Sequence, residues 1–521
     1  MIRSIPALLW LSILLGSTLW SVSNLFVDAE LSAKWYLLLP TLTIGVILIT
    51  VAQLFTEKDL KTLLPSTNEI ALIVVTISSS QAIYGLLQAV GTLTSPYANL
   101  VVGSFDNPAG FASALAFSFP FCFTLWHTKR RMLQGIGILA GIILISAIVA
   151  SNSRTGIFTV VGVGLAYILY TAQQKKRIIG LAVVIILGAL LSFFYFYKKD
   201  SSDGRVLIWK CTSEMIKEHP LIGYGPNGFK ANYMNFQAKH FALQPEDKFA
   251  QLADNVKWPF NEYLQLIVSY GLVGGIALLV LVVLLIQAWR KCPSASSNTA
   301  MGCLLSIALF SLFSYPFSYP FTWIFFVGSI LLVFHNAYPS KIGTQQKGLI
   351  FVSALLCIGS FFSLQRMRAE MEWCQISDLA MCGQSEKAFP IYTRIKKELW
   401  RKPTFLYNYA AELNNAGCYN ESIKIALECE TLYADYDLQL LLADNYSQTK
   451  QYKKAAMCYK KANMMCPNRF EPLTELYFMY KKIGNRLMAN QLGREILKKP
   501  VKINSLEVKS LRNTVLLDLK N

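Results

Sequence analysis

Charged residues are scarce in this sequence. Of its 521 residues, 15% are charged and 54% are hydrophobic, and the mean hydropathy is +0.39. An ordinary soluble domain is about one quarter charged. The shortage is uneven, because apolar stretches long enough to cross a hydrocarbon core of about 30 Å recur up to about residue 365 and then stop. We therefore expect a polytopic membrane domain followed by a soluble domain.

Metal-binding patterns are also missing. The chain has four histidines, and its 11 cysteines form neither a CxxC pair nor a Cys/His cluster with the spacing of a zinc site. The sequence therefore indicates no metal and no cofactor. Six cysteines fall in the C-terminal part, mostly in helical stretches where a free thiol serves as a small apolar residue. A disulfide stays an open alternative there if the compartment is oxidising.

A basic-aromatic recognition motif is absent as well, although the net charge is +18. Lys and Arg collect in the cytoplasmic loops of membrane proteins and beside anionic lipids, which accounts for much of this excess. Membrane lipids are therefore expected partners and nucleic acid is not. No clear A-x-A cleavage site follows the first apolar run, so we interpret that run as a retained helix.

Apolar helical sequence, by contrast, is abundant. About eleven transmembrane helices are expected in residues 1–365, so the fold class of this domain is all-α. The expected spans are residues 5–21, 35–55, 71–90, 111–126, 133–150, 157–171, 178–197, 263–289, 300–313, 321–335 and 349–364. Prolines interrupt SLFSYPFSYPF (311–321), which is compatible with a tight hairpin or with one broken helix.

Basic loops recur at alternate ends of these spans. They are EKDLK (57–61), KRR (129–131), QQKKR (173–177), RK (290–291) and the loop with Lys341 and Lys347. Placing them in the cytoplasm, as the positive-inside rule requires, puts the N-terminus inside. Residues 91–110, 151–156, the long loop 198–259 and everything after about 365 are then outside.

Residues 366–521 follow a period near 34. Small residues recur at this spacing, and a second contact residue follows each of them four positions later: Ala388 and Tyr392, Ser422 and Ala426, Ala455 and Tyr459, Ala489 and Gly493. This pattern is typical of tetratricopeptide-type helix pairs. Such pairs stack into an α-solenoid because none can bury its apolar face alone. We expect the solenoid to bind a protein partner.

Three motifs lie on the outer side of this topology. SNSRTGIF (151–158), GRVLIW…HPLIGYGPNGF (204–229) and NEYLQLIVSYGLVGG (261–275) resemble, in pattern and order, the O-antigen ligase superfamily. That superfamily includes lipopolysaccharide O-antigen ligases, O-antigen polymerases and bacterial O-oligosaccharyltransferases. The resemblance covers roughly residues 100–335, and GSFDNPAGFAS (103–113) has a counterpart in family members.

The resemblance implies a glycosyltransferase that needs neither a nucleotide sugar nor a metal. It would move a glycan from undecaprenyl pyrophosphate to a hydroxyl of the lipid A core or of a protein, on the periplasmic face of a bacterial inner membrane. Arg154 and Arg205 match arginines of the family pattern. They are the expected pyrophosphate ligands, because a guanidinium binds phosphate in a bidentate fork. Lys210, in the same loop as Arg205, is a further candidate.

The general base is less clear from the sequence. Family ligases often carry a histidine near the Asn of the third motif, where this chain has Trp258, Pro259 and Phe260. His219 and His240 lie on the outer side, and His219 precedes a proline at an expected helix end. The remaining base candidates are His240, Asp254 and Glu262, and Glu262 is favoured because it opens the third motif. Asn261 and Gln265, one helical turn apart, are expected to bind glycan or phosphate, or else to bond neighbouring helices.

Three other functions stay open. A polymerase would use the same donor and differ only in its acceptor. A transporter or flippase would need charges inside its spans, and these spans have almost none. A non-catalytic scaffold would use the repeats alone. For residues 103–113, a simple helix start, with Asp106 or Asn107 as cap and Pro108 in the first turn, is a sufficient explanation.

Overall fold

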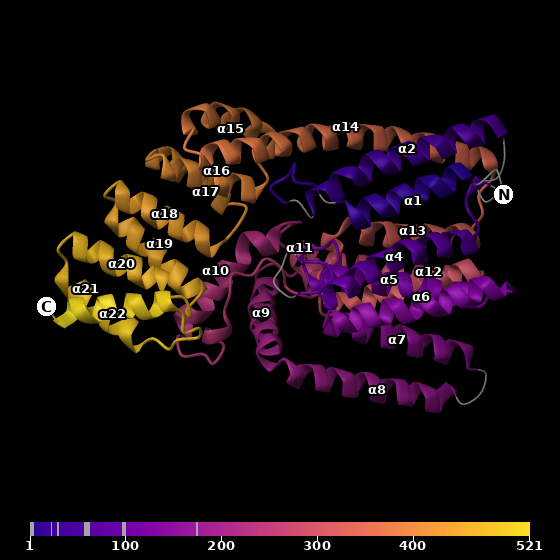
Figure 1. Ribbon diagram of the computed structural model, residues 1–521, viewed down its shortest axis with the longest axis horizontal. Helices are drawn as coiled ribbons and strands as arrows, with labels where there is room; N and C mark the ends of the chain where they lie inside the picture. The colour runs from indigo at the N-terminus through magenta and orange to yellow at the C-terminus, as the bar shows by residue number, and fades with distance from the viewer. Residues whose placement is uncertain are drawn as a thin grey trace. The chain divides into compact units, whose positions relative to one another are not determined.

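The structure is a computed structural model that describes residues 5–21, 23–28, 31–56, 63–95, 100–172 and 176–520 (Figure 1). Within these ranges the regular structure consists of α-helices and two single-turn 3-10 helices, without a strand. The all-α class expected from the sequence is confirmed. The chain divides into two compact units, here called the membrane unit (Met1–Tyr195, Phe260–Glu262 and Ala277–Cys374) and the outer unit (Phe196–Pro259, Tyr263–Ile276 and Gln375–Asn521).

The membrane unit is a bundle of apolar helices. It contains α1 (Ile5–Trp20), α2 (Ser32–Thr56), α4 (Thr67–Ala89), α5 (Pro108–Trp126), α6 (Arg131–Ala150), α7 (Arg154–Thr171), α8 (Lys176–Tyr197), α12 (Ala295–Ser311), η2 (Pro316–Ser318) and α13 (Pro320–Ala337). It also holds the C-terminal part of α11 (Glu262–Lys291) and most of α14 (Ile342–Met381).

The expected polytopic helical domain is confirmed, and the expected count of about eleven spans holds approximately. In the part of the chain that is described, nine helices are long and apolar enough to cross a membrane, and Ala7–Trp20 and Ala295–Ser311 are two shorter apolar helices. SLFSYPFSYPF forms a hairpin, in which η2 joins α12 to α13, and is not one broken helix. The basic stretch EKDLK and the first three residues of QQKKR lie outside the described residues.

Helix α5 forms the centre of the membrane unit. Of its apolar window, 78% is buried, and α4, α6, α7 and α12 pack against it. Aromatic contacts run through this core; the rings of Phe117 and Phe310, for example, meet edge to face with centroids 5.7 Å apart. By contrast, none of the apolar window of α8 is buried. Its side chains therefore face outward, as suits a helix in contact with lipid.

The outer unit consists of short amphipathic helices. They are α9 (Lys199–Glu218), α10 (Gly228–Leu243), η1 (Ala250–Leu252), α15 (Ser385–Leu399), α16 (Pro403–Asn415), α17 (Tyr419–Glu430), α18 (Tyr436–Gln448), α19 (Tyr452–Met465), α20 (Glu471–Lys482), α21 (Arg486–Lys498) and α22 (Leu506–Lys520). Residues 263–276 of α11 also belong to this unit.

The repeat pattern predicted from the sequence is confirmed by burial. Ala388, Ser422 and Ala455 are fully buried, and Ala489 is 5% exposed. The turns inside the helix pairs repeat too, because left-handed residues recur at the same spacing: Gly383 (φ 78°), Gly417 (φ 77°), Lys450 (φ 60°) and Gly484 (φ 74°). Glycine adopts this conformation without the steric cost that other residues meet, so the turn glycines carry the period as clearly as the apolar positions do.

The loop 198–259 and the repeats form one body. Helix α10 packs on α19, and the Lys230 carbonyl accepts a hydrogen bond from the Ala434 N–H at 3.0 Å. The buried side chain of Gln237 donates to the Met465 carbonyl at 2.6 Å. Two segments that pack together in this way lie on the same side of a membrane. The positive-inside rule made the same assignment from the spacing of Lys and Arg.

Candidate functional site

A polar cluster caps helix α5 in the membrane unit. Asn107 is the N-cap residue, because its Oδ1 accepts a hydrogen bond from the Gly110 N–H at 2.8 Å, and Pro108 follows at the first helical position. The Asn107 amide donates to the Tyr319 hydroxyl at 2.7 Å, which in turn donates to the Asp106 carboxylate at 2.7 Å. The helix start expected for this segment is therefore present, and Tyr319 ties it to the hairpin of α12 and α13.

The start of α11 joins the same end of the bundle. The Asn261 amide donates to the Leu312 carbonyl at 3.1 Å, and the Glu262 carboxylate accepts from the Phe317 N–H at 2.9 Å. The Phe260 ring lies edge-on to Tyr315, with centroids 5.3 Å apart, and the Asn107 amide approaches the Tyr315 hydroxyl at 3.4 Å. We call Asp106, Asn107, Asn261, Glu262, Tyr315 and Tyr319 the cap cluster. Sequence reasoning missed its two tyrosines, which the hydroxyl-rich SYPFSYP motif could have indicated.

A buried lysine supports the segment that leads into this cluster. The Lys34 side chain is 1% exposed; its ammonium donates to the Ser104 carbonyl at 2.6 Å and lies 3.8 Å from the centre of the Phe105 ring. A buried ammonium is tolerated only where hydrogen bonds and the electron-rich face of an aromatic ring compensate for its lost hydration. Sequence reasoning missed Lys34 as well, since it resembles an ordinary interfacial lysine at the start of a span.

Arg154 is the first residue of α7. The Ser153 hydroxyl caps this helix by accepting from the Gly156 N–H at 3.3 Å, and Asn152 makes the tight turn with a left-handed φ of 53°. The partly buried guanidinium of Arg154 donates to the Phe194 carbonyl near the end of α8, at 2.8 Å. A cation at the C-terminal carbonyls of a helix is favourable. This contact therefore holds the Arg154 side chain at the N-terminal end of α7, beside the Ser153 cap.

The outer unit holds the other loop candidates. Arg205 lies partly buried on α9. The His240 Nε2 and the Lys210 ammonium both approach one oxygen of Asp247, at 2.9 and 3.5 Å. Burial of Asp247 raises its pKa, but the Phe249 N–H, the His240 hydrogen bond and the Lys210 charge together hold the pKa below its usual value. His240 is therefore engaged by a carboxylate that sequence reasoning did not single out.

Asp254 pairs with a residue of the repeats. Its carboxylate lies 2.9 Å from the Arg469 guanidinium, which also sits 4.4 Å from the centre of the Tyr436 ring. The contact joins residues 215 positions apart. It gives Asp254 a connecting role between the loop and the repeats, which no local pattern in the sequence indicated.

Helix α11 is broken at Gly271, and the turn HPLIGYGPNGF fills the break. The N–H groups of Tyr224 and Gly225 donate to the carbonyls of Val268 and Ser269, at 2.8 and 2.9 Å. In return, the N–H groups of Leu272 and Val273 donate to the carbonyls of Pro220 and Leu221, at 2.8 and 3.2 Å. In an intact helix these four groups of α11 would bond to one another. The turn thus replaces two hydrogen bonds within α11, and all four backbone groups that would have formed them have partners in the turn.

This crossing depends on glycine. Gly223 and Gly271 have left-handed φ values of 67° and 59°. A Cβ atom on Gly271 would lie 2.3 Å from the Leu221 carbonyl, and one on Gly223 would lie 2.5 Å from the Val268 oxygen. Gln265, three residues before the crossing, donates weakly to the Ser269 hydroxyl at 3.4 Å, and its buried carbonyl oxygen has no hydrogen-bond partner among the described residues.

The predicted site residues thus fall into two groups. Arg154, Asn261 and Glu262 belong to the membrane unit, where Asn261 and Glu262 share the cap cluster. Arg205, Lys210, His240, Asp254 and Gln265 belong to the outer unit, and there His240 and Lys210 share Asp247. In the described part of the chain, no group of three or more His, Cys, Asp and Glu side chains has the arrangement of a metal site.

Comparisons with known proteins add one family. Residues 139–279 match the model of the O-antigen ligase family. No protein with a curated description matches the chain. Two solved structures align with it: yeast Tom70, at 10% identity over 87% of this chain and 97% of that one with a TM-score of 0.25, and the APC/C hetero-tetramer Cut9-Hcn1, at 9% identity over 91% and 93% with a TM-score of 0.26. Scores this low carry no argument, and the repeat fold rests on the helix pairs described above.

The match covers part of the site, and Asp106, Asn107, Tyr315 and Tyr319 of the cap cluster lie outside it. Residues 139–279 include Arg154, the helices α9 and α10, the cap-cluster residues Asn261 and Glu262, and the crossing at Gly271. The chain has the apolar helices of a multi-pass membrane protein, and its residues 139–279 are similar to the O-antigen ligase family.

Proposed function

We propose that this protein is a glycan ligase of a bacterial inner membrane. It transfers a glycan from undecaprenyl pyrophosphate to a hydroxyl of an acceptor, either the lipid A core or a Ser or Thr side chain of a protein. The reaction takes place on the periplasmic face, where the proposed topology puts the cap cluster, the loop 198–259 and the repeats.

The observation that carries the proposal is the crossing at Gly271. Two motifs of the matched segment, far apart in sequence, are joined there by four backbone hydrogen bonds. Gly223 and Gly271 are required for this contact. A turn built this specifically from two motifs of the matched segment supports a binding role for that segment rather than a passive anchor.

The chemistry assigns a separate task to each group. The acceptor oxygen forms a bond to the anomeric carbon while the bond from that carbon to the pyrophosphate oxygen breaks, and the acceptor proton passes to a base. Arg154 and Arg205 bind the departing pyrophosphate, because fixed cations stabilise charge that develops in the transition state. Glu262 is the proposed base. Of the three candidates, His240 and Asp254 are already engaged by Asp247 and Arg469, whereas Glu262 accepts one backbone hydrogen bond.

The test compares deletion cells that carry wild type, Arg154→Ala, Arg154→Lys or an empty vector. Lipopolysaccharide, capsule and glycoproteins are separated on gels, and undecaprenyl-linked glycan is quantified by mass spectrometry. Full-length carrier-linked glycan should accumulate without the protein, together with one unglycosylated acceptor class. We expect Arg154→Ala to restore about 10–100-fold less transfer than wild type, as the loss of charge-assisted hydrogen bonds implies. Arg154→Lys should restore little, because lysine lacks the planar fork.

Arg177→Ala is the matched control, since Arg177 is exposed at the opposite end of the helices and should restore transfer fully. Accumulation of single carrier-linked repeat units would identify a polymerase instead. No change in any glycan on deletion would reject an enzymatic role and favour a scaffold that acts through the repeats.

A further inference from the structure

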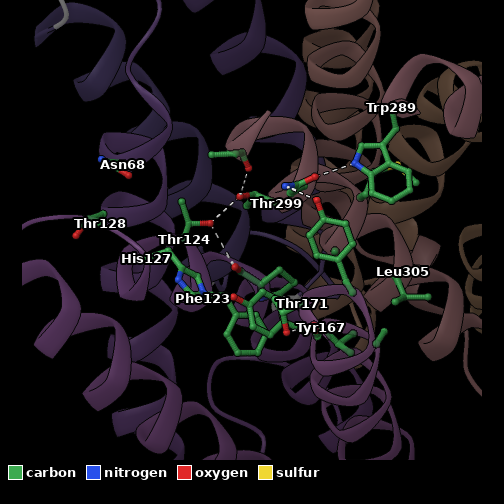
Figure 2. Close-up of a pocket in the computed structure, with 18 residues that line it drawn as sticks. Asn68, Phe123, Thr124, His127, Thr128, Tyr167, Thr171, Trp289, Thr299 and Leu305 are labelled. Atoms are coloured by element: carbon green, nitrogen blue, oxygen red, sulfur yellow. Dashed lines mark hydrogen bonds between the residues drawn. The ribbon is translucent and has the colours of Figure 1, made fainter. Parts of the chain in front are cut away.

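The membrane unit contains a cavity that the proposed reaction does not use. It has a volume of about 630 Å³ and lies between the ends of α5, α7 and α11 and the starts of α4 and α12 (Figure 2). Pockets that bind organic ligands usually measure about 300–1,000 Å³. The size of the cavity therefore suits a molecule much larger than water.

This cavity is remote from the cap cluster. Helices α5 and α7 begin beside Asn107 and at Arg154, and their other ends, at His127 and Thr171, line the cavity. A 19-residue helix such as α5 is about 28 Å long at 1.5 Å per residue. The two sites thus lie at opposite ends of the same spans, on opposite sides of the membrane.

Several polar groups in the cavity wall are bonded to one another. The Thr124 and Thr299 hydroxyls are hydrogen-bonded to each other (Figure 2), at 2.6 Å. The Asn298 side chain accepts from Trp289 at 2.8 Å and donates to the Tyr170 hydroxyl at 3.2 Å. Tyr167 is hydrogen-bonded to His127. These bonds leave a wall of aromatic and aliphatic surface, so the part of a ligand that enters the cavity should be apolar.

Basic residues adjoin the cavity lining in the sequence, and from this position we infer a cationic rim. Lys129, Arg130 and Arg131 follow the lining residue Thr128, and Arg290 and Lys291 follow the lining residue Trp289. The acidic residue next to the lining residue Asn68 is Glu69, whose carboxylate is engaged by Ser66 in a capping box. An occupant with an apolar body and an anionic head would match both the wall and the rim.

We propose that the cavity binds an anionic phospholipid of the cytoplasmic leaflet, with one hydrocarbon chain in the cavity and the phosphate at the basic rim. The negative surface charge of that leaflet favours such a lipid beside Lys and Arg. This inference is independent of the glycan reaction, because it rests on residues at the opposite end of the bundle.

The test measures lipids bound to the purified full-length protein. The protein is washed in detergent and then titrated with phosphatidylglycerol, phosphatidylethanolamine or undecaprenyl phosphate, and native mass spectrometry counts the bound molecules. Ala166→Trp and Thr171→Trp each fill the cavity from a different position on α7. Ile168→Trp is the matched control, because Ile168 lies on the same helix and is 53% exposed outside the cavity.

We expect one tightly bound phosphatidylglycerol in wild type and in Ile168→Trp, and at least a fivefold loss in both cavity-filling variants at an unchanged melting temperature. Lys129→Ala combined with Arg130→Ala should abolish the preference for phosphatidylglycerol over phosphatidylethanolamine, whereas Arg177→Ala should not. Equal lipid retention in wild type and both tryptophan variants would overturn the site. Stronger binding of undecaprenyl phosphate than of phosphatidylglycerol would overturn the choice of a phospholipid.

Discussion

The candidate general bases of this protein differ most in the groups that already bind their side chains. From the sequence, His240, Asp254 and Glu262 were all candidates for a general base, and Glu262 was favoured only because it opens the third motif. In the structure, Asp247 holds His240 at 2.9 Å and Arg469 holds Asp254 at 2.9 Å, both by side-chain contacts, whereas Glu262 is held by the backbone N–H of Phe317. Arg469 favours the ionised form of Asp254 and so weakens it as a base, whereas no side-chain cation among the described residues holds Glu262 in this way.

We therefore expect Glu262→Gln to lower the turnover number of glycan transfer by about 10²–10⁴-fold, the usual contribution of a general base, with little change in KM. Asp254→Asn should cost less than tenfold. The measurement is transfer from purified lipid-linked glycan in proteoliposomes. A larger loss for Asp254→Asn than for Glu262→Gln would reverse this assignment.

The cysteines differ in the same way. All eleven are free thiols in the structure, so the disulfide left open by the sequence is not formed there. Burial raises the pKa of the Cys466 thiol to about 12 despite the nearby charge of Arg469. Because this pKa lies above the ordinary value of about 8.5, the stabilisation gained by keeping the thiol protonated is complete below pH 8.5 and is lost as the pH rises toward 12.

Under native conditions, a maleimide should therefore label exposed Cys382 at least about 100-fold faster than Cys466, because reaction requires an accessible thiolate. Labelling of Cys466 should accelerate as the pH is raised from 7 to 10, in parallel with a falling free energy of unfolding. Peptide mass spectrometry measures both rates, and Cys382→Ser should remove only the fast one. Equal rates at pH 7 would contradict the buried position of Cys466.

Among the elements, α11 was the least accurately predicted. Residues 263–289 were expected to form one span because the apolar run is continuous. The break at Gly271 could not be deduced, since a glycine inside an apolar run is compatible with an unbroken helix. The break exists because a distant turn supplies the missing hydrogen bonds. The start of α5, by contrast, was predictable, because Asn107 and Pro108 at a helix start act through local chemistry.

Gly271→Ala should destabilise the protein by at least about 2 kcal/mol, because the added Cβ meets backbone and the left-handed φ is unfavourable for alanine. Gly275→Ala, four residues further along α11, meets nothing within 4 Å and should be neutral or slightly stabilising. Thermal unfolding followed by circular dichroism measures the difference. Similar melting temperatures for the two variants would show that the crossing is not tightly packed.

A buried glutamine joins α10 to the repeats. Gln237 is fully buried; its amide donates to the carbonyls of Met465 and Asp254 and its own carbonyl accepts from Tyr233. Gln237→Leu leaves these groups without partners, which should cost about 2–4 kcal/mol. Limited proteolysis should then cut residues 244–259 faster. Gln244→Leu, at the exposed end of α10, is the control and should leave the cleavage rate unchanged.

At the scale of the whole molecule, the approximate number of spans and the repeat architecture were both predictable, because each depends on a periodic or continuous apolar pattern. The association of the loop 198–259 with the repeats was not. Its contacts join residues about 200 positions apart, such as Lys230 with Ala434 and Asp254 with Arg469. A single sequence holds no periodic signal for such pairs.

This association predicts a topology. A membrane-impermeant maleimide should label Lys239→Cys and native Cys382 from the same side of the membrane, and Arg177→Cys from the other side. With the proposed orientation, the first two react in intact cells once the outer membrane is permeabilised, and the third reacts only after lysis. Labelling of Lys239→Cys and Cys382 from opposite sides would contradict the compact outer unit.

The same long-range packing has a consequence for biosynthesis. About 200 residues separate Lys230 from Ala434, and ribosomes add about 5–20 residues per second. After α10 has been translocated, its repeat-facing surface therefore waits about 10–40 s for the helices that cover it. During that interval Gln237, which is fully buried in the finished fold, lacks its hydrogen-bond partner Met465. We expect this stage of synthesis to be the one that most needs a periplasmic chaperone.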